Sequence, residues 1–160
     1  MDHVDKIINQ WRQERRQLNT KPMATIGRVM RLSIVFGREM EKTFKSFGLN
    51  FASFDVLATL RRAGEPYALS PGDLIESTMV TSGTMTNRID QLAKNGLVKR
   101  LQSKHDKRSV LISLTEKGFD VIDAAIGKHV ETQEKLTSVL TKKEQESLDK
   151  ILRKMTTCFE

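Results

Sequence analysis

The sequence has few of the residues that build disulfide scaffolds, rigid turns or membrane segments. Its 160 residues include one cysteine, three prolines, one tryptophan and one tyrosine. The single cysteine, Cys158, excludes an intramolecular disulfide and is compatible with a reducing cytoplasm. No apolar run approaches the ~20 residues that span a bilayer, and residues 1–11 lack the basic start of a secretory signal. We therefore expect a cytoplasmic protein with no membrane partner.

Residues suited to catalysis or metal binding are also scarce. His3, His105 and His129 are scattered, and no cysteine lies near them at metal-ligand spacing. A phosphate-binding loop, a nucleophile–base pair and a carboxylate dyad are all missing. Cys158, close to the C-terminus, is typical of a tolerated thiol rather than of a redox sensor. We expect no enzyme activity, no catalytic residues, no metal and no resident cofactor.

Positive charge, in contrast, is in excess and is clustered. The formal net charge is +7 and the pI is about 9.7. Residues 81–117 contain eight Lys and Arg against three Asp and Glu, so this short segment accounts for +5 of the total. A uniformly solvated surface would not concentrate charge in this way, and the clustering favours a nucleic-acid partner.

Apolar residues recur at helical spacing along most of the chain, which predicts a mainly α single domain over residues 1–160. The first helix is expected over residues 3–18, with Trp11 and Leu18 on its buried stripe and Lys21-Pro22 breaking it. A second helix of about 24 residues, longer than most globular helices, should end at Gly48. Further helices are expected over residues 51–64 (with Phe51 in the core) and after Thr115 and Thr141, the first of these two with an apolar stripe that continues to Val139.

The segment between residues 70 and 115 has the pattern of a winged helix-turn-helix. Ser70-Pro71 opens a short helix, and a second helix is expected over residues 81–95, with Met79 filling the wedge between them. The second helix has an apolar stripe and an opposite polar face. Two strands, residues 97–102 and 109–114, flank a polar tip and form a small β-hairpin wing. Residues 49–115 thus form the DNA-reading module.

The helices on either side of this module have larger apolar stripes than the module can cover. They occupy residues 1–48 and 116–160. The simplest physical use of such stripes is an intertwined homodimer, which would also pair two recognition helices. We therefore expect N- and C-terminal dimerisation helices.

Several segments resemble the MarR family of bacterial transcriptional regulators. They are NGLVKR followed by DKRSVLISLTEKG, with LNFASFDVLATL, ALSPGDLIESTMVTSGTMTNRIDQL and LTKKEQESLDKIL in the same order. The resemblance covers roughly residues 24–157, and its most specific part is Asp106-x-Arg108 followed by Leu114-Thr115. It implies a homodimer that binds a pseudo-palindromic double-stranded DNA operator. It also implies a small-molecule or oxidant signal that usually releases the DNA.

The DNA contacts expected from this arrangement fall into two groups. The recognition helix would use hydroxyl, amide and guanidinium side chains in the major groove, where Asn87 suits adenine and Arg88 suits guanine. At the wing, Arg108 would enter the minor groove, held by Asp106, although these two residues could instead form an ordinary surface ion pair. The full candidate set is Thr81, Ser82, Thr84, Thr86, Asn87, Arg88, Lys104, Asp106, Lys107 and Arg108.

A candidate ligand site consists of Trp11, Asp55, Arg88 and Arg100. Their placement resembles the urate-responsive, PecS-like branch of the family, in which a tryptophan and one arginine hold urate while an aspartate and a second arginine link the pocket to the recognition helix. The chemistry fits, because an indole stacks on a planar anion and Arg100 can pair with its charge. Asp55 interrupts an apolar helix and would need a cationic partner such as Arg88.

Simpler interpretations of these residues stay open. Trp11 could be an ordinary core residue, and Asp55 an exposed helix charge. The effector, best identified as urate, could instead be a phenolic or other aromatic anion. The basic face could also bind an acidic protein, or bind DNA without ligand control. The sequence thus predicts a DNA-binding regulator, most simply a repressor released by a small anionic aromatic effector.

Overall fold

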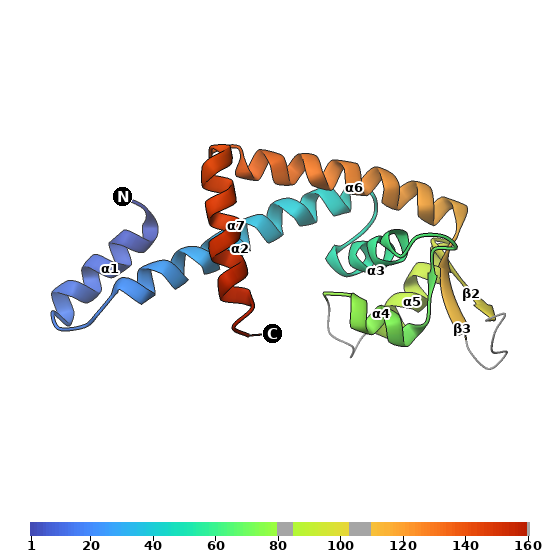
Figure 1. The fold of residues 1–160 in the computed structure, drawn as a ribbon, viewed down its shortest axis with the longest axis horizontal. Coiled ribbons are helices and arrows are strands. Elements are labelled where there is room, and N and C mark those ends of the chain that lie inside the picture. Colours follow the sequence, from blue (N-terminus) through green and yellow to red (C-terminus); the bar gives the residue numbers. More distant parts are fainter. Residues whose placement is uncertain (80–84, 103–109, 160) are drawn as a thin grey trace. The chain divides into compact units, whose positions relative to one another are not determined.

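The computed structural model describes residues 1–79, 85–102 and 110–159. These residues form mostly helices, with three short strands (Figure 1). In chain order they are α1 (His3–Glu14), α2 (Lys21–Lys45), α3 (Phe51–Arg62), β1 (Ala68–Leu69), α4 (Pro71–Ser77), α5 (Met85–Lys94), β2 (Val98–Gln102), β3 (Val110–Leu114), α6 (Glu116–Thr137) and α7 (Lys142–Thr156). They form two compact units, Met1–Glu39 and Met40–Glu160.

In the N-terminal unit, α1 is fixed by its first turn. Asp2 caps the helix, and a reciprocal capping box joins it to Asp5. Arg28 of α2 pairs with both carboxylates, and Val4 and Ile8 form the buried side of α1. The backbone N–H of Asp5, followed by Arg28, holds the pKa of the Asp2 carboxyl below its ordinary value.

Three predictions for this region were wrong in detail. The first helix ends at Glu14, so Leu18 lies outside it. Pro22 does not terminate this helix; it sits in the first turn of α2, where proline is tolerated because the N–H there needs no intrahelical partner. Trp11 is 39% exposed within this chain, because only the first half of the apolar stripe is buried.

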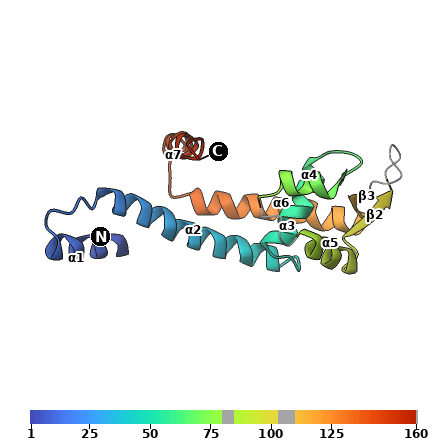
Figure 2. The same ribbon diagram turned by 90° about the horizontal axis from the view of Figure 1, so that it is seen from below.

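The C-terminal unit is built around α3. This helix contacts α4, α5, α6 and β3, and α6 runs alongside it in both views (Figures 1 and 2). Val56, Leu57 and Leu60 are fully buried at the centre. Phe51, predicted to be a core residue, is 40% exposed because it stands at the start of the helix and touches only the edge of Phe44.

The predicted helix-turn-helix is present, with α4 capped as expected. Ser70 and Asp73 form a capping box, and Pro71 is in the first turn. Within the recognition helix, the described part begins at Met85. Met79 does not fill the wedge between the helices: its side chain is 85% exposed, and its backbone serves a different purpose, described below.

The wing strands pair as predicted, and a third strand joins them. β2 and β3 are antiparallel, with Val98 opposite Leu114. β1 adds to the other edge of β3, with Ala68 opposite Ser113, giving the order β1-β3-β2. β1 was missed because two residues are too few to show the alternation that identifies a strand.

The junction between α5 and α6 is packed backbone to backbone. The Thr115 hydroxyl donates to the Gly96 carbonyl at 2.7 Å and accepts from the Gly118 N–H at 2.9 Å. A Cβ on Gly118 would lie 1.9 Å from the Leu97 carbonyl oxygen. Only glycine therefore lets α6 begin this close to the segment that leads into the wing.

Long apolar faces on α2 and α7 are left uncovered within one chain. Of the α2 residues, Phe44 is buried, and no residue of α7 is. The exposed large side chains of these two helices are Met23, Ile26, Val29, Met30, Leu32, Ile34 and Val35 on α2, and Leu148, Ile151, Leu152 and Met155 on α7. Val139, predicted to extend the α6 stripe, is 85% exposed and lies after the helix ends.

An aromatic cluster closes the core where the end of α2 meets α3 and α6. Phe44 and Phe54 stack at 4.1 Å between ring centroids, and His129 lies 4.9 Å from Phe54. Burial lowers the pKa of His129, and its buried Nδ1 has no hydrogen-bond partner in the part of the chain that the structure describes. The neutral imidazole therefore acts here as a third aromatic ring.

Across the described ranges, the helices are all too short or too polar to cross a membrane.

We expect Gly118→Ala to lower the free energy of unfolding by about 1–3 kcal/mol, because backbone must move to admit the methyl group. The matched change Gly127→Ala, on the same helix with nothing near the added Cβ, should raise it by about 0.5–1 kcal/mol. Urea denaturation of both variants measures the difference. Equal effects would contradict the close approach of α6 to Leu97.

Candidate nucleic-acid interface

α5 separates an apolar side from a polar side, as the sequence predicts. Met85, Ile89 and Leu92 are each at most 2% exposed and join the core. Thr86 and Asn87, on the other side, are exposed. Burial of one stripe therefore fixes the rotation of the helix and turns a hydroxyl and an amide outward, where they can meet base edges.

The remaining predicted DNA contacts are not covered by the structure. Thr81, Ser82, Thr84, Lys104, Asp106, Lys107 and Arg108 lie outside the described residues. Their assignments stay predictions.

Arg88 has an intermediate position on α5. Its residue is partly buried, and its Nη1 atom is fully buried with no hydrogen-bond partner among the residues that the structure describes. A buried guanidinium nitrogen without an acceptor is costly. Part of this side chain is thus directed inward, away from the exposed face that carries Thr86 and Asn87.

Asp55 is buried and anchors the end of α4. It is 6% exposed, which excludes the alternative of an exposed helix charge. Its Oδ2 accepts the Met79 backbone N–H at 2.8 Å. In the described part of the chain, no ion pair joins Asp55 to Arg88, the partner that the sequence suggested. The backbone N–H at the end of α4 supplies a hydrogen bond to the carboxylate instead.

Arg100 connects the wing to the recognition helix. From β2, its Nη2 pairs with Asp90 Oδ1 of α5 at 2.7 Å, and both side chains are half exposed. A pair this accessible to water contributes under about 1 kcal/mol. It therefore orients the two elements more than it stabilises them, and it leaves Arg100 easily drawn to a stronger anion.

The four predicted ligand residues are divided between the two units. Asp55, Arg88 and Arg100 belong to the C-terminal unit, on α3, α5 and β2, and α5 contacts both of the other elements. Trp11 belongs to the N-terminal unit, where it lines a shallow hollow of about 530 Å³ with Gln10, Gln13 and Glu14.

Two contacts in this region were missed by sequence reasoning. A main-chain donor such as the Met79 N–H has no signature in a sequence, and the Asp90–Arg100 pair depends on how the wing folds back on α5. The unusual position of Asp55 in an apolar helix was the one available signal. The described residues also contain no cluster of three or more His, Cys, Asp or Glu side chains suited to a metal ion.

Comparison with known proteins identifies the family. The MarR family model matches residues 49–110. The transcriptional regulator PecS of Dickeya dadantii is 38% identical over 93% of this chain and 90% of its own length. The chain belongs to the MarR family. The transcriptional repressor YetL of Bacillus subtilis is 31% identical over 76% of the chain and 70% of its own length.

A solved member of the family shares the fold. A mutant of MarR from E. coli, crystallised with operator DNA, superposes with a TM-score of 0.72 at 26% identity, covering 87% of this chain and 99% of that one. The protein is therefore a winged-helix, DNA-binding transcriptional regulator of the MarR family and not an enzyme. α4 and α5 are its helix-turn-helix, and β2 and β3 are its wing.

We expect Asn87→Ala to weaken binding to the operator by about 1–3 kcal/mol, the usual value of one bidentate base contact, with no change on random duplex DNA. Fluorescence anisotropy with both duplexes measures this. Gln133→Ala, an exposed amide on α6, is the control and should alter neither. Equal losses on operator and random DNA would show that Asn87 contacts phosphate instead.

Proposed function

We propose that this MarR-family member is a homodimeric repressor that binds a pseudo-palindromic operator and is released by a small anionic aromatic ligand, with urate as the best candidate. The ligand response rests on Arg88 of the recognition helix, whose buried Nη1 has no hydrogen-bond partner among the residues that the structure describes. It offers a hydrogen-bond donor to an anion on the same helix that presents Asn87 outward.

The homodimer is supported by the uncovered apolar faces of α2 and α7. Ile34 and Ile151 are each more than half exposed among the residues that the structure describes, and burying such faces is the main driving force of obligate assembly. A two-fold dimer would carry two copies of α5, which suits two half-sites of a pseudo-palindrome. Lys104 and Lys107 would contact phosphates, and Arg108, held by Asp106, would enter the minor groove.

The release step is proposed to act through Arg88 and Asp55. An anion that accepts a hydrogen bond from Arg88 would draw the guanidinium toward itself. The same negative charge would repel the buried Asp55 carboxylate, which holds the Met79 N–H at the end of α4. Both effects displace the helix-turn-helix from the geometry that reads the operator.

Trp11 and Arg100 would complete the site. The exposed indole of Trp11 offers a plane for stacking. Arg100 is held by a solvent-exposed pair with Asp90, so a ligand anion can compete for it. To take operator occupancy from nearly full to nearly empty, the ligand must favour the released state by about 5 kcal/mol.

Titration of urate into the protein–operator complex tests the proposal. We expect DNA release and a change of Trp11 fluorescence over the same concentration range. The variant Asp55→Asn keeps a hydrogen-bond acceptor for Met79 but removes the charge, so it should bind urate and release DNA less completely. Neutral hypoxanthine is the control and should not release the DNA.

Two outcomes would change the proposal. No release and no fluorescence change at millimolar urate would remove urate as the effector. Release by a phenolic anion such as salicylate, without a response to urate, would keep the mechanism and replace the ligand.

A further inference from the structure

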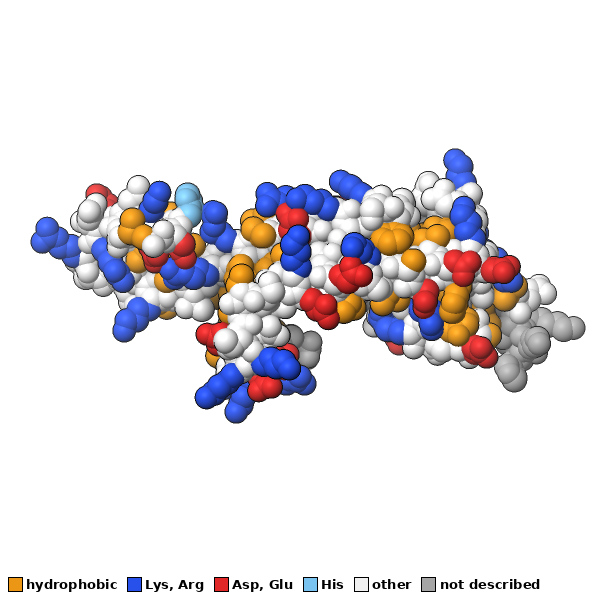
Figure 3. Space-filling model, turned by 90° about the horizontal axis from the view of Figure 1, so that it is seen from above, with side chains coloured by type: hydrophobic (Ala, Val, Ile, Leu, Met, Phe, Trp, Pro, Cys, Tyr) orange, Lys and Arg blue, Asp and Glu red, His pale blue; other side chains and the backbone are white. Residues whose placement is uncertain are grey.

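The N-terminal unit carries a second concentration of positive charge, separate from the winged helix. Residues 1–39 contain eight Lys and Arg and four Asp and Glu, a net charge of +4. Figure 3 shows Lys and Arg side chains over the surface of this unit. Arg28 is neutralised by Asp2 and Asp5, whereas among the described residues no ion pair involves Arg12, Arg15 or Arg16.

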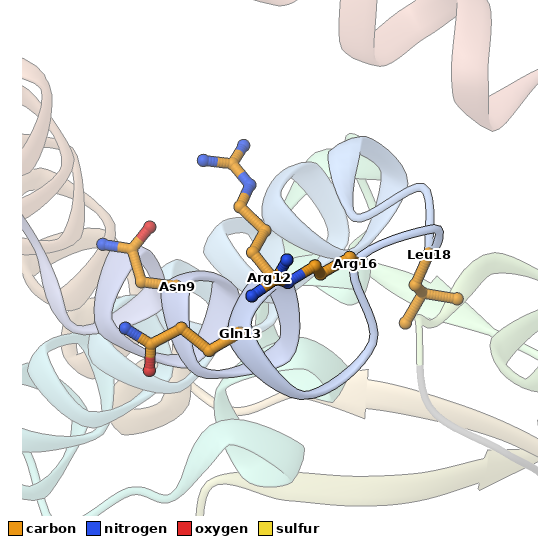
Figure 4. Close-up of a pocket in the computed structure, with 5 residues that line it drawn as sticks. All are labelled: Asn9, Arg12, Gln13, Arg16 and Leu18. Carbon is orange, nitrogen blue, oxygen red and sulfur yellow. The ribbon is translucent and has the colours of Figure 1, made fainter.

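Two of these arginines, Arg12 and Arg16, lie close to the side-chain amides of Asn9 and Gln13. Asn9, Arg12 and Gln13 are exposed and neighbour one another at i, i+3 and i+4 on α1, and Arg16 lies in the turn that follows the helix. Together with Leu18 they line an open hollow of about 680 Å³ (Figure 4). We call Asn9, Arg12, Gln13 and Arg16 the α1 basic face.

An internal contact orients Arg12 within this face. Arg12 Nε donates to the Thr20 hydroxyl at 3.4 Å, and Thr20 is buried. The terminal nitrogens of Arg12 have no partner among the residues that the structure describes, so they are available to an external acceptor. A side chain held at its Nε loses less entropy on binding than a free one.

Favourable interaction with the helix dipole does not account for the whole face. Arginines in the last turn of α1 do complement its C-terminus, which is sufficient reason for Arg12 and Arg15. Arg16 follows the end of the helix, however, and neutral amides such as Asn9 and Gln13 gain nothing from the dipole. Guanidinium and amide donors on one face are the set that hydrogen-bonds to phosphate oxygens.

We propose that the α1 basic face binds the phosphate backbone of DNA, in addition to the contacts made by the winged helix. The chain is a DNA-binding regulator, so a bound duplex raises the local concentration of phosphates for every other basic surface of the same chain. The contact carries no sequence information, because phosphates are the same at every base pair. It strengthens binding to operator and to random duplex by the same factor.

The salt dependence of DNA binding tests this in the full-length protein. The double variant Arg12→Gln, Arg16→Gln should lower the slope of log K against log salt by about 1.8 per protomer, since each phosphate contact contributes about 0.9. The loss should be equal on the operator and on a random duplex of the same length. The control Lys150→Gln, Lys154→Gln removes the same charge at the same spacing from the exposed surface of α7.

The outcomes separate clearly. A lower slope in the α1 variant, with the α7 control close to wild type, supports the contact. Equal slopes in the α1 variant and the control would overturn it and leave an acidic protein partner as the alternative for this face. A loss confined to the operator would also overturn it, because it would indicate base reading. The urate response enters none of these measurements, so its failure would leave the result unaffected.

Discussion

Burial of one side of α5 is the interaction on which the DNA-reading surface depends. Met85, Ile89 and Leu92 are almost completely removed from water, which contributes about 1.5–3 kcal/mol for each side chain. The exposed Asp90–Arg100 pair on the same helix contributes less than about 1 kcal/mol. Apolar packing therefore sets the rotation of α5 and the outward position of Asn87, while the ion pair only adjusts the wing.

Asp55 and Arg88 lie near this apolar packing, but they do not stabilise the fold in the way that the apolar side chains do. The Asp55 carboxylate is buried at a cost and accepts the Met79 N–H at the end of α4. Arg88 has a buried nitrogen with no hydrogen-bond partner in the described part of the chain. Two apolar side chains of similar volume would stabilise the fold at least as well. Their presence beside the helix-turn-helix is what makes a charged ligand able to change its geometry in the proposed mechanism.

The sequence predicted those features that rest on periodic burial or on local capping. The stripe of α5, the helix starts at Ser70 and Thr141, and the antiparallel pairing of β2 with β3 were all confirmed. Trp11 was misplaced because helical spacing shows that a face is apolar but not what covers it. The main-chain partner of Asp55 and the pairing of Arg100 with Asp90 could not be predicted, since both depend on tertiary geometry.

Hydrogen exchange at the Met79 amide tests most directly whether Asp55 couples the ligand to the recognition helix. The account predicts slow exchange at this amide in the free protein, where Asp55 holds its N–H. It predicts faster exchange when saturating urate releases the operator. Unchanged protection of Met79 in the presence of urate that does release the DNA would contradict this coupling.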